Sequence, residues 1–285
     1  DLTGSTTTKK FAAAAPENAD KLFNCGIAEQ NMIDVAAGLA LTGHVAYTGS
    51  FAVFGTGRAY DQIRNTVCYS NLDVKICPTH AGVSVGPDGG SHQMLEDVSL
   101  MRGLPNMRVL VPADYAAARA AIKLAAKTPG PVYVRMGRAA VPCVYDDDVE
   151  LEIGRAYVLR EGSDATVVAC GVEIREALAA ADMLAEEGVS IEVIDAFSVK
   201  PLDEDAITAS VAKTGCCVVA EEHSVHGGLG SAVAECLARK NPAPCEFVGV
   251  QDRFGKSGEF EELLGYFNLD AAAIVEAVKR ARGRK

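Results

Sequence analysis

The hydrophobic positions alternate between short runs rich in β-branched residues and longer alanine-rich stretches along the whole chain. This alternation is typical of parallel α/β layers, in which short buried strands are joined by helices that cover both faces of the sheet. It predicts two consecutive α/β domains, each built on a parallel sheet. A polar stretch with Pro142 and the acidic run Asp146–Asp148 separates the two series, and we interpret this run as a solvated linker rather than a metal site. We therefore place the boundary near residue 155, with domains at 1–155 and 156–285.

The two domains contain similar series of elements, and no internal repeat is visible. In the first domain we expect strands at 22–26, 44–51, 73–81, 107–113 and 131–137, and helices at 30–41, 56–68, 92–102 and 113–127. In the second domain we expect strands at 165–171, 190–196, 216–222 and 245–250, and helices at 173–187, 203–213, 228–239 and near 270–282. Asp114 follows "VPA" and is a good N-cap for its helix.

Composition excludes several classes of protein. The 285 residues are 49% hydrophobic and 23% charged, which is ordinary for a soluble globular protein. A net charge of −11 without a Lys/Arg cluster argues against nucleic acid as a partner. No apolar run reaches the roughly 18 residues of a membrane-spanning helix, and no signal-peptide pattern opens the chain. The chain begins at Asp1 without a methionine, so we expect residues to be missing ahead of it.

The nine cysteines are scattered and include no C-x-x-C pair, which argues against zinc and thioredoxin-type chemistry. Reduced, mostly buried thiols in a cytoplasmic protein are the favoured interpretation.

The stretch "GVSVG" at 82–86 matches G-x-S-x-G, the nucleophile elbow of α/β hydrolases. That elbow requires a helix to begin directly after the serine. Here "PDGGS" follows, which favours a loop, so we reject the hydrolase interpretation.

The same segment, "THAGVSVGPDGGSHQ", places His80, Asp88 and His92 on one glycine-rich loop after a strand. Ligands of open α/β sheets bind at the carboxyl ends of strands, and these polar groups suit a hydroxylated substrate. A surface loop without function fits the spacing equally well.

Other candidates have similar alternatives. Phe51 and Phe54 are either core residues or a wall for a flat heteroaromatic ring. Arg138 is either a surface charge or a phosphate clamp at the end of a strand. The segment "EEHSVHGGLGSA" at 221–232 leads into a helix N-terminus that can receive an anion, but it lacks a complete G-x-G-x-x-G. Glu29, in "CGIAEQNM", is either a helix-end charge or a buried proton-handling carboxylate.

In combination, these segments resemble the transketolase family, and more narrowly the separate C-terminal subunit of a split transketolase. The resemblance rests on "DLTGS", "GIAEQNM", "GSFAVFGTGRAYDQIRN", "THAGVSVGPDGGSHQ", "PNMRVLVPAD" and "VYVRMGR", in this order. It covers essentially the whole chain. It implies a pyrimidine-binding thiamine-diphosphate fold followed by the Rossmann-like transketolase C-terminal domain.

The resemblance implies a catalytic role for Glu29, because the matching glutamate of the family hydrogen-bonds N1′ of the aminopyrimidine of thiamine diphosphate. A carboxyl group in an apolar pocket has a raised pKa and can share a proton with that nitrogen. The remaining implied roles are as follows: His80 and His92 contact the donor ketose near the reacting carbons, Phe51 and Phe54 surround the pyrimidine with Phe54 stacking, Asp88 reads a substrate hydroxyl, Ser5 and Arg138 bind the sugar phosphate, and Asp1, Leu2 and Ile27 lie beside the cofactor.

Two departures from the family pattern affect the site. Gly57 stands where a further aromatic residue is expected, three residues after Phe54. Pro87 and "DGGSHQ" replace an acidic residue and "DGPTHQ", which keeps Asp88 and His92 but alters the rim of the substrate site.

The chain contains no "GDG" followed by an asparagine, the family motif that holds magnesium and diphosphate. The resemblance therefore implies an N-terminal partner subunit that carries the diphosphate-binding domain with Mg²⁺ (or Ca²⁺), in an α2β2 heterotetramer. The implied activity is the transketolase reaction of the pentose phosphate pathway, which transfers a two-carbon ketol unit from a ketose phosphate to an aldose phosphate. Two alternatives remain. One is a subunit of a related enzyme, deoxyxylulose-phosphate synthase-like or 2-oxoacid dehydrogenase E1 beta-like. The other is a catalytically inactive binding subunit.

Overall fold

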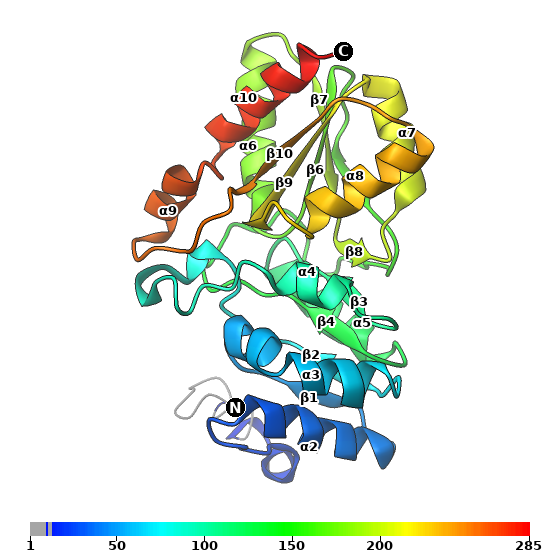
Figure 1. The fold of residues 1–285 in the computed structure, drawn as a ribbon, viewed down its shortest axis with the longest axis vertical. Helices are drawn as coiled ribbons and strands as arrows, with labels where there is room; N and C mark the ends of the chain where they lie inside the picture. Colours follow the sequence, from blue (N-terminus) through cyan, green and yellow to red (C-terminus); the bar gives the residue numbers. More distant parts are fainter. Residues whose placement is uncertain (1–9, 11–12) are drawn as a thin grey trace.

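The computed structural model describes residue 10 and residues 13–285. It contains two five-stranded sheets, stacked along the long axis of the molecule (Figure 1). All but one of the strand pairs in each sheet are parallel. The predicted pair of consecutive parallel-sheet α/β domains is confirmed.

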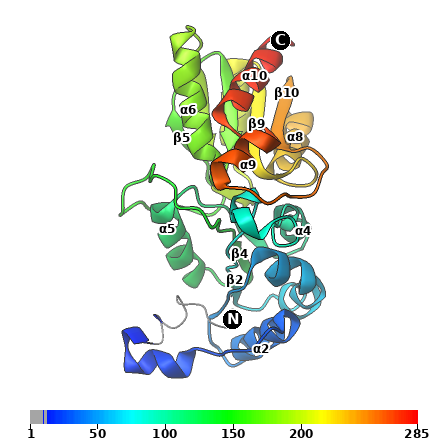
Figure 2. The same cartoon turned by 90° about the vertical axis from the view of Figure 1, so that its left-hand side faces the viewer.

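The first sheet has the strand order β1-β2-β4-β3-β8. Its strands are β1 (Ala46–Thr48), β2 (Val74–Ile76), β3 (Arg108–Leu110), β4 (Val132–Val134) and β8 (Ser198–Lys200). The surrounding helices are η1 (Pro16–Lys21), α2 (Glu29–Leu41), η2 (Val53–Arg58), α3 (Tyr60–Gln62), η3 (Ile63–Cys68), η4 (Val83–Asp88), α4 (Asp97–Arg102) and α5 (Tyr115–Ala126). Helix α5 covers one face of the sheet, and α2 and α4 lie on the other (Figure 2). The two covered faces explain why β2 and β4 are buried at every position.

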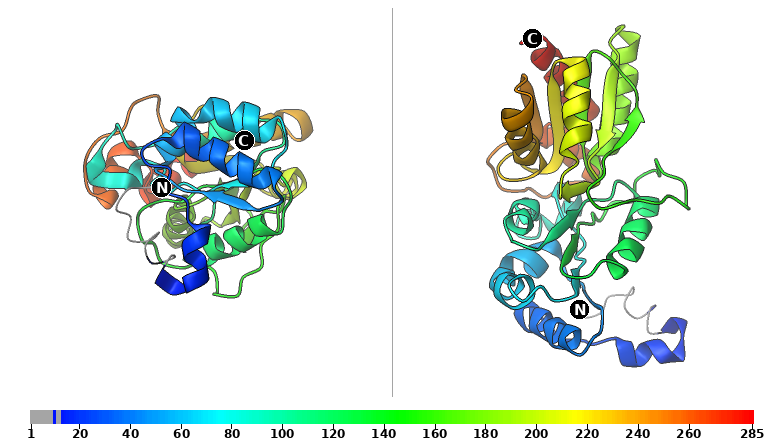
Figure 3. Two further views of the ribbon diagram at one scale, coloured as in Figure 1. Left: turned by 90° about the horizontal axis from the view of Figure 1, so that it is seen from below. Right: turned by 90° about the vertical axis from the view of Figure 1, so that its right-hand side faces the viewer.

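The second sheet has the strand order β10-β9-β6-β7-β5. Its strands are β5 (Tyr157–Arg160), β6 (Ala165–Ala169), β7 (Ile191–Asp195), β9 (Cys217–Ser224) and β10 (Cys245–Val250). The helices are α6 (Glu173–Glu186), α7 (Glu204–Thr214), α8 (Leu229–Lys240), α9 (Phe260–Phe267) and α10 (Ala271–Arg282). Helices α6 and α10 pack together on one face, and α7 and α8 on the other (Figures 1 and 3).

Aspartate N-caps define the starts of three long helices. Their carboxylates accept hydrogen bonds from the third residue of the helix: Asp114 from Ala117 N, Asp203 from Ala206 N and Asp270 from Ala273 N, at 2.8 to 3.1 Å. Each cap satisfies a backbone N–H that has no partner within its own helix. The prediction of Asp114 as an N-cap is confirmed.

Several predicted elements differ from the structure. Residues 22–26 form no strand, because no other segment among the described residues pairs with them. The side chain of Phe23 in this segment is exposed. The helix expected at 92–102 begins only at Asp97, because the preceding glycine-rich residues fold as turns. The edge strand β5 and helix α9 were not predicted, because neither has a long apolar run.

Strand β8 belongs in sequence to the second domain but pairs with β3 of the first sheet. Phe197, which precedes the strand, and Val199, within it, are buried in the apolar clusters that surround that sheet. Lys200 Nζ donates to Arg102 O at 2.9 Å, which ties β8 to the end of α4. The division at residue 155 remains a prediction, and the structure shows that the second half returns to complete the first sheet.

Candidate active site

Glu29 opens helix α2 close to the end of β1. Its side chain is buried, and both carboxylate oxygens accept hydrogen bonds. Ser50 Oγ donates to Oε1 at 3.2 Å, and Arg58 Nη1 donates to Oε2 at 2.9 Å. Ser50 follows β1 and Arg58 ends η2, so three segments of the chain meet at one carboxylate. The partners hold the group in one place, as a proton-handling group requires.

The pKa of Glu29 is lower than its ordinary value. Burial by itself raises the pKa of this carboxyl, but the hydrogen bond from its own backbone N–H, together with Arg58 and Ser50, outweighs burial. The expectation of an apolar pocket that raises this pKa is therefore wrong. Arg58 is a main reason, and the pairing of Arg58 with Glu29 depends on the tertiary fold.

Four predicted rings, those of Phe51, Phe54, His80 and His92, gather beside one another. Phe51 stacks on His80 with ring centroids 4.2 Å apart. The ring of His92 stands edge-on to Phe51 at 5.8 Å and to Phe54 at 5.3 Å. Neither phenylalanine is fully buried, so these rings line a surface rather than fill the core. The group offers flat apolar faces beside imidazole nitrogens, a combination that suits a heteroaromatic ring next to a polar reactant.

Arg58 is a site residue that the sequence reasoning missed. Its guanidinium lies 4.3 Å from the ring centroid of Phe54 while it also donates to Glu29. A cation four residues after an aromatic residue in a helical stretch was an available signal, since such pairs face each other. About half of the Arg58 side chain (45%) is exposed, so the guanidinium can leave this position for solvent.

His80 lies in a strained backbone conformation beyond the end of β2, with φ of 65°. A non-glycine residue at positive φ persists only when its surroundings hold it there, and such residues cluster at functional sites. The stack on Phe51 and a 2.7 Å hydrogen bond between Thr79 Oγ1 and His80 Nδ1 provide that support. Burial and the nearby charge of Arg138 lower the pKa of His80, so its ring is neutral near pH 7.

Asp88 and Arg138 lie together at the edge of the site. Arg138 Nη1 is 3.1 Å from Asp88 Oδ2 and donates to Val85 O at 2.6 Å. Both side chains are more than a third exposed. Such an exposed pair is weak, so either partner remains free to bind a substrate group.

Ile27 is 80% exposed and Phe23 is 51% exposed on the segment that leads into α2. Both side chains offer apolar surface to solvent beside the start of α2. The predicted site residues Asp1, Leu2 and Ser5 lie outside the described residues.

The "GVSVG" segment forms no nucleophile elbow. Ser84 is buried in η4, and its Oγ donates to Ala81 O at 3.4 Å. Its backbone N–H donates to Glu222 Oε1 of the second domain at 2.5 Å. Gly82 is required here, because a Cβ at this position would overlap the Glu222 carboxylate. The motif therefore binds the Glu222 side chain of the second domain.

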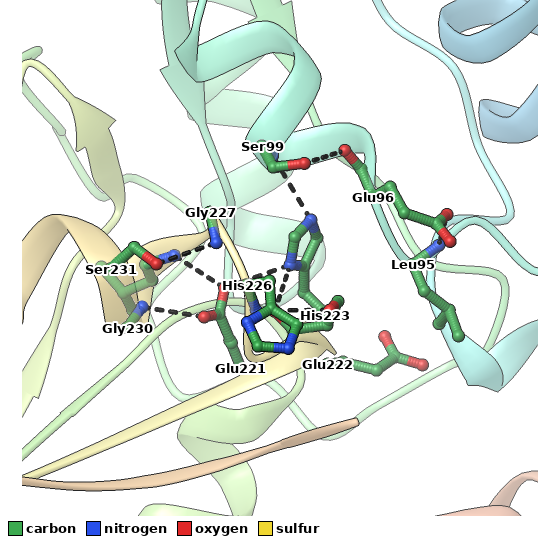
Figure 4. Close-up of polar contacts among 12 residues, drawn as sticks. Leu95, Glu96, Ser99, Glu221, Glu222, His223, His226, Gly227, Gly230 and Ser231 are labelled. Carbon is green, nitrogen blue, oxygen red and sulfur yellow. Dashed lines mark hydrogen bonds and ion pairs between the residues drawn. The ribbon is translucent and has the colours of Figure 1, made fainter. Parts of the chain in front are cut away.

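The N-terminus of α8 is already occupied by a group of its own segment. Glu221 accepts hydrogen bonds from Leu229 N at 2.7 Å and Gly230 N at 2.8 Å (Figure 4). His223 is buried and accepts a hydrogen bond at Nε2 from Ser99 N, at 3.3 Å. The anion site predicted at 221–232 is thus filled by an internal carboxylate, and this segment serves contact between the domains.

Other features of the described residues bear on function. No group of three or more His, Cys, Asp or Glu among them is arranged to hold a metal ion. The nine cysteines are free thiols, most of them buried. None of the helices in the described part of the chain combines the length and apolar character that a membrane crossing requires. A groove of about 490 Å³ between the domains is lined by Arg102, Lys200 and Arg239, but these cations are already bound by neighbouring carboxylates or carbonyls.

Comparisons with known proteins agree with this architecture. Residues 1–144 match the family "Transketolase, pyrimidine binding domain", and residues 154–274 match "Transketolase, C-terminal domain". A "Putative transketolase C-terminal section" of Methanocaldococcus jannaschii is 45% identical, over 98% of this chain and 87% of that protein. A 6-deoxy-6-sulfo-D-fructose transketolase subunit of a Clostridium species is 42% identical, over 100% of this chain and 88% of that protein.

The fold agrees with a solved structure as well. A chain described as "Split gene transketolase, inactive beta4 tetramer" superposes with a TM-score of 0.90 at 49% identity, covering 100% of this chain and 90% of that chain. The fold and the matched families define a pyrimidine-binding domain joined to a transketolase C-terminal domain. The chain belongs to the transketolase family, which implies dependence on thiamine diphosphate.

The residues present fit the pyrimidine half of that cofactor. A buried carboxylate beside half-buried phenylalanine faces provides a hydrogen-bond acceptor and an apolar wall for an aminopyrimidine ring. The lowered pKa of Glu29 means that its carboxyl group is ionised near pH 7. The guanidinium of Arg58 lies between this carboxylate and the ring of Phe54 and contacts both.

Proposed function

We propose that this chain is the C-terminal subunit of a two-chain transketolase, which moves a two-carbon ketol unit from a ketose phosphate to an aldose phosphate. The observation that carries the proposal is the series of contacts from Glu29 through Arg58 to Phe54 and His92, in a chain that matches both transketolase domains. When bound, thiamine diphosphate would supply a nucleophilic carbon and an electron sink.

Glu29 would hold the proton at N1′ of the aminopyrimidine. An ionised carboxylate that two donors fix in position is a strong acceptor for a protonated ring nitrogen. Phe54 would pack against the ring, and Ile27 would form part of the apolar surface beside it. Asp1 and Leu2 would add to this part of the site.

His80, His92 and Asp88 would recognise the donor sugar. A neutral imidazole both donates and accepts, so His80 can bind a hydroxyl or carbonyl oxygen near the reacting carbons. Asp88 would accept from a substrate hydroxyl, and Arg138 together with Ser5 would bind the terminal phosphate. The exposed Asp88–Arg138 pair would open for this purpose, and its opening costs little.

The other half of the site would come from a partner. The two matched families cover only the pyrimidine-binding and C-terminal domains, so the diphosphate and Mg²⁺ (or Ca²⁺) would be held by an N-terminal transketolase subunit in an α2β2 assembly. The exposed side chains of Ile27 and Phe23 fit a surface covered by that subunit.

The partner requirement is tested with the purified chain. We expect no tight binding of thiamine diphosphate with Mg²⁺ by the chain alone in calorimetry, and tight binding after the N-terminal subunit is added. Tight binding without the partner would overturn the two-chain proposal.

The donor is tested in the reconstituted pair. The Clostridium relative is named for a sulfonated ketose, and Arg138 can clamp a sulfonate as well as a phosphate. Xylulose 5-phosphate and 6-deoxy-6-sulfofructose are therefore compared as donors to an aldose phosphate, with pyruvate as the donor typical of the related enzymes. Turnover of either ketose supports the proposal. Turnover of pyruvate alone, or of no donor, would replace it with one of the two alternatives.

A further inference from the structure

The segment 79–93, which carries His80, Asp88 and His92, is held from behind by the second domain. At its start, Ser84 N donates to Glu222 Oε1, at the end of β9. At its end, it lies against residues 255–258, in the connection between β10 and α9, and α9 itself packs beside η4 (Figure 1). The predicted substrate-binding side chains thus stand on a loop that the C-terminal domain helps to support.

Gln93 is the centre of the second contact. Its side chain is buried, and its amide bridges the two domains. Gln93 Nε2 donates to Lys256 O at 2.9 Å and to Val83 O at 3.1 Å, while Oε1 accepts from Lys256 N at 2.8 Å. Because Lys256 N can only donate, the atom that faces it must be the amide oxygen, which fixes the orientation of the amide. One side chain therefore joins both ends of the loop to the backbone of the other domain.

Glycines allow this close approach. A Cβ at Gly90 would come within 2.7 Å of Gly255 O, and a Cβ at Gly255 would overlap Gln93 Oε1. Two backbones meet here without side chains between them. Because the contact involves backbone and a buried amide, it transmits position more rigidly than a contact between flexible surface side chains.

We propose that Gln93 is a positioning residue, through which the C-terminal domain fixes Asp88 and His92 where the donor sugar binds. The proposal rests on the proposed function for its effect on the reaction. His92 is the neighbour of Gln93, and both backbone N–H groups donate to Gly89 O, at 3.0 and 3.1 Å. A shift of Gln93 therefore moves His92 and the turn beside Asp88 together.

The test breaks the contact once from each domain. Gln93→Met keeps the size of the side chain but removes all of its hydrogen bonds. Gly255→Ala does not change residue 93, but its methyl group would occupy the position of the Gln93 amide oxygen and displace it. The control is Ser210→Ala, which removes a buried hydrogen bond to Thr166 within the second domain, away from the loop.

The first measurement is amide hydrogen–deuterium exchange of the full chain over residues 82–92. We expect both variants to exchange faster there than the wild type, and the control to exchange at the wild-type rate. Unchanged exchange in both variants would overturn the proposal, whatever the chain catalyses.

The second measurement is donor kinetics of the reconstituted pair. A displacement of about 1 Å can cost up to about 10²-fold in rate. We therefore expect the KM for the donor to rise by about 10-fold or more, while the affinity for thiamine diphosphate stays unchanged. The double variant should be little worse than either single one, because both remove the same contact. If the exchange becomes faster but the donor KM does not change, the positioning role is wrong. If the wild-type pair uses no ketose donor, the proposed function fails, and the exchange result still decides whether the contact holds the loop.

Discussion

Glu29 and Asp97 are buried carboxylates that each pair with an arginine, and the two pairs differ in what surrounds the arginine. Glu29 pairs with Arg58, whose side chain is 45% exposed. Asp97 pairs with Arg135, whose side chain is only 6% exposed. Arg135 Nε donates to Asp97 at 2.8 Å and Nη2 donates to Glu222 O of the second domain at 2.8 Å. Arg58 can exchange its carboxylate partner for water, whereas Arg135 has almost no access to solvent.

This difference separates a replaceable contact from a structural one. Removing one member of a buried pair leaves an uncompensated charge in a region of low dielectric, whereas an exposed member is replaced by water. The Glu29 pair therefore suits a site that must admit a ligand. Arg135 of the buried pair also donates to Glu222 O of the second domain, so the Asp97–Arg135 pair suits a permanent junction.

The largest expected effect comes from breaking the junction. Arg135→Met leaves Asp97 without its cation, so we expect a loss of about 3–5 kcal/mol in the free energy of unfolding, measured with urea. The control Arg155→Met disrupts the exposed pair with Glu152 and should cost less than about 1 kcal/mol. Equal losses in the two variants would show that burial does not distinguish these pairs.

The next effect concerns the proposed proton-handling group. Glu29→Gln keeps the shape and polarity of the side chain, so the fold and the assembly should survive. Turnover of the reconstituted pair should fall by about 10² to 10⁴-fold, because an amide cannot handle the proton at N1′. Deuterium exchange at thiazolium C2 should slow in Glu29→Gln and persist in His92→Ala, which should instead raise the donor KM and lower kcat. Unslowed exchange in Glu29→Gln would show that Glu29 is only a helix-end charge.

The smallest effect tests the replaceable pair. The pKa of Glu29 is lowered in the folded chain, so its ionised form adds stability above the unfolded value near 4.5, and this contribution is lost as the pH falls through the folded pKa. Arg58→Met leaves burial in place and removes both the hydrogen bond and the charge of Arg58, so the pKa of Glu29 should rise. At about pH 7 we expect a loss of less than about 1 kcal/mol, because Arg58 is half exposed, and the loss should shrink on acidification.

Urea unfolding across that pH range measures the Arg58 effect, with Arg58→Lys as a control that retains a charge without the planar fork. A loss that is independent of pH would mean that Arg58 acts by packing on Phe54 rather than through the carboxylate.

Most of the fold was predictable because it rests on local signals. The buried runs at β6 and β7, and the N-cap Asp114 of α5, follow directly from residue type and spacing. The strand expected at 22–26 failed for a non-local reason, since an extended segment becomes a strand only when another segment pairs with it. Strand β8 could not be assigned to the first sheet, because its pairing with β3 depends on how the second domain folds back.

The candidate site divides in the same way. The sequence alone determined the family and the residues that we propose for the chemistry: Glu29, the two phenylalanines, and His80, Asp88 and His92 on one glycine-rich loop. Only the tertiary structure decided their electrostatics and support. Arg58 lowers the pKa of Glu29, and Glu222 and Gln93 tie the substrate loop to the C-terminal domain. Charge interactions and hydrogen bonds act over a few ångströms in space, and the positions that they join lie from 29 to 163 residues apart along the chain.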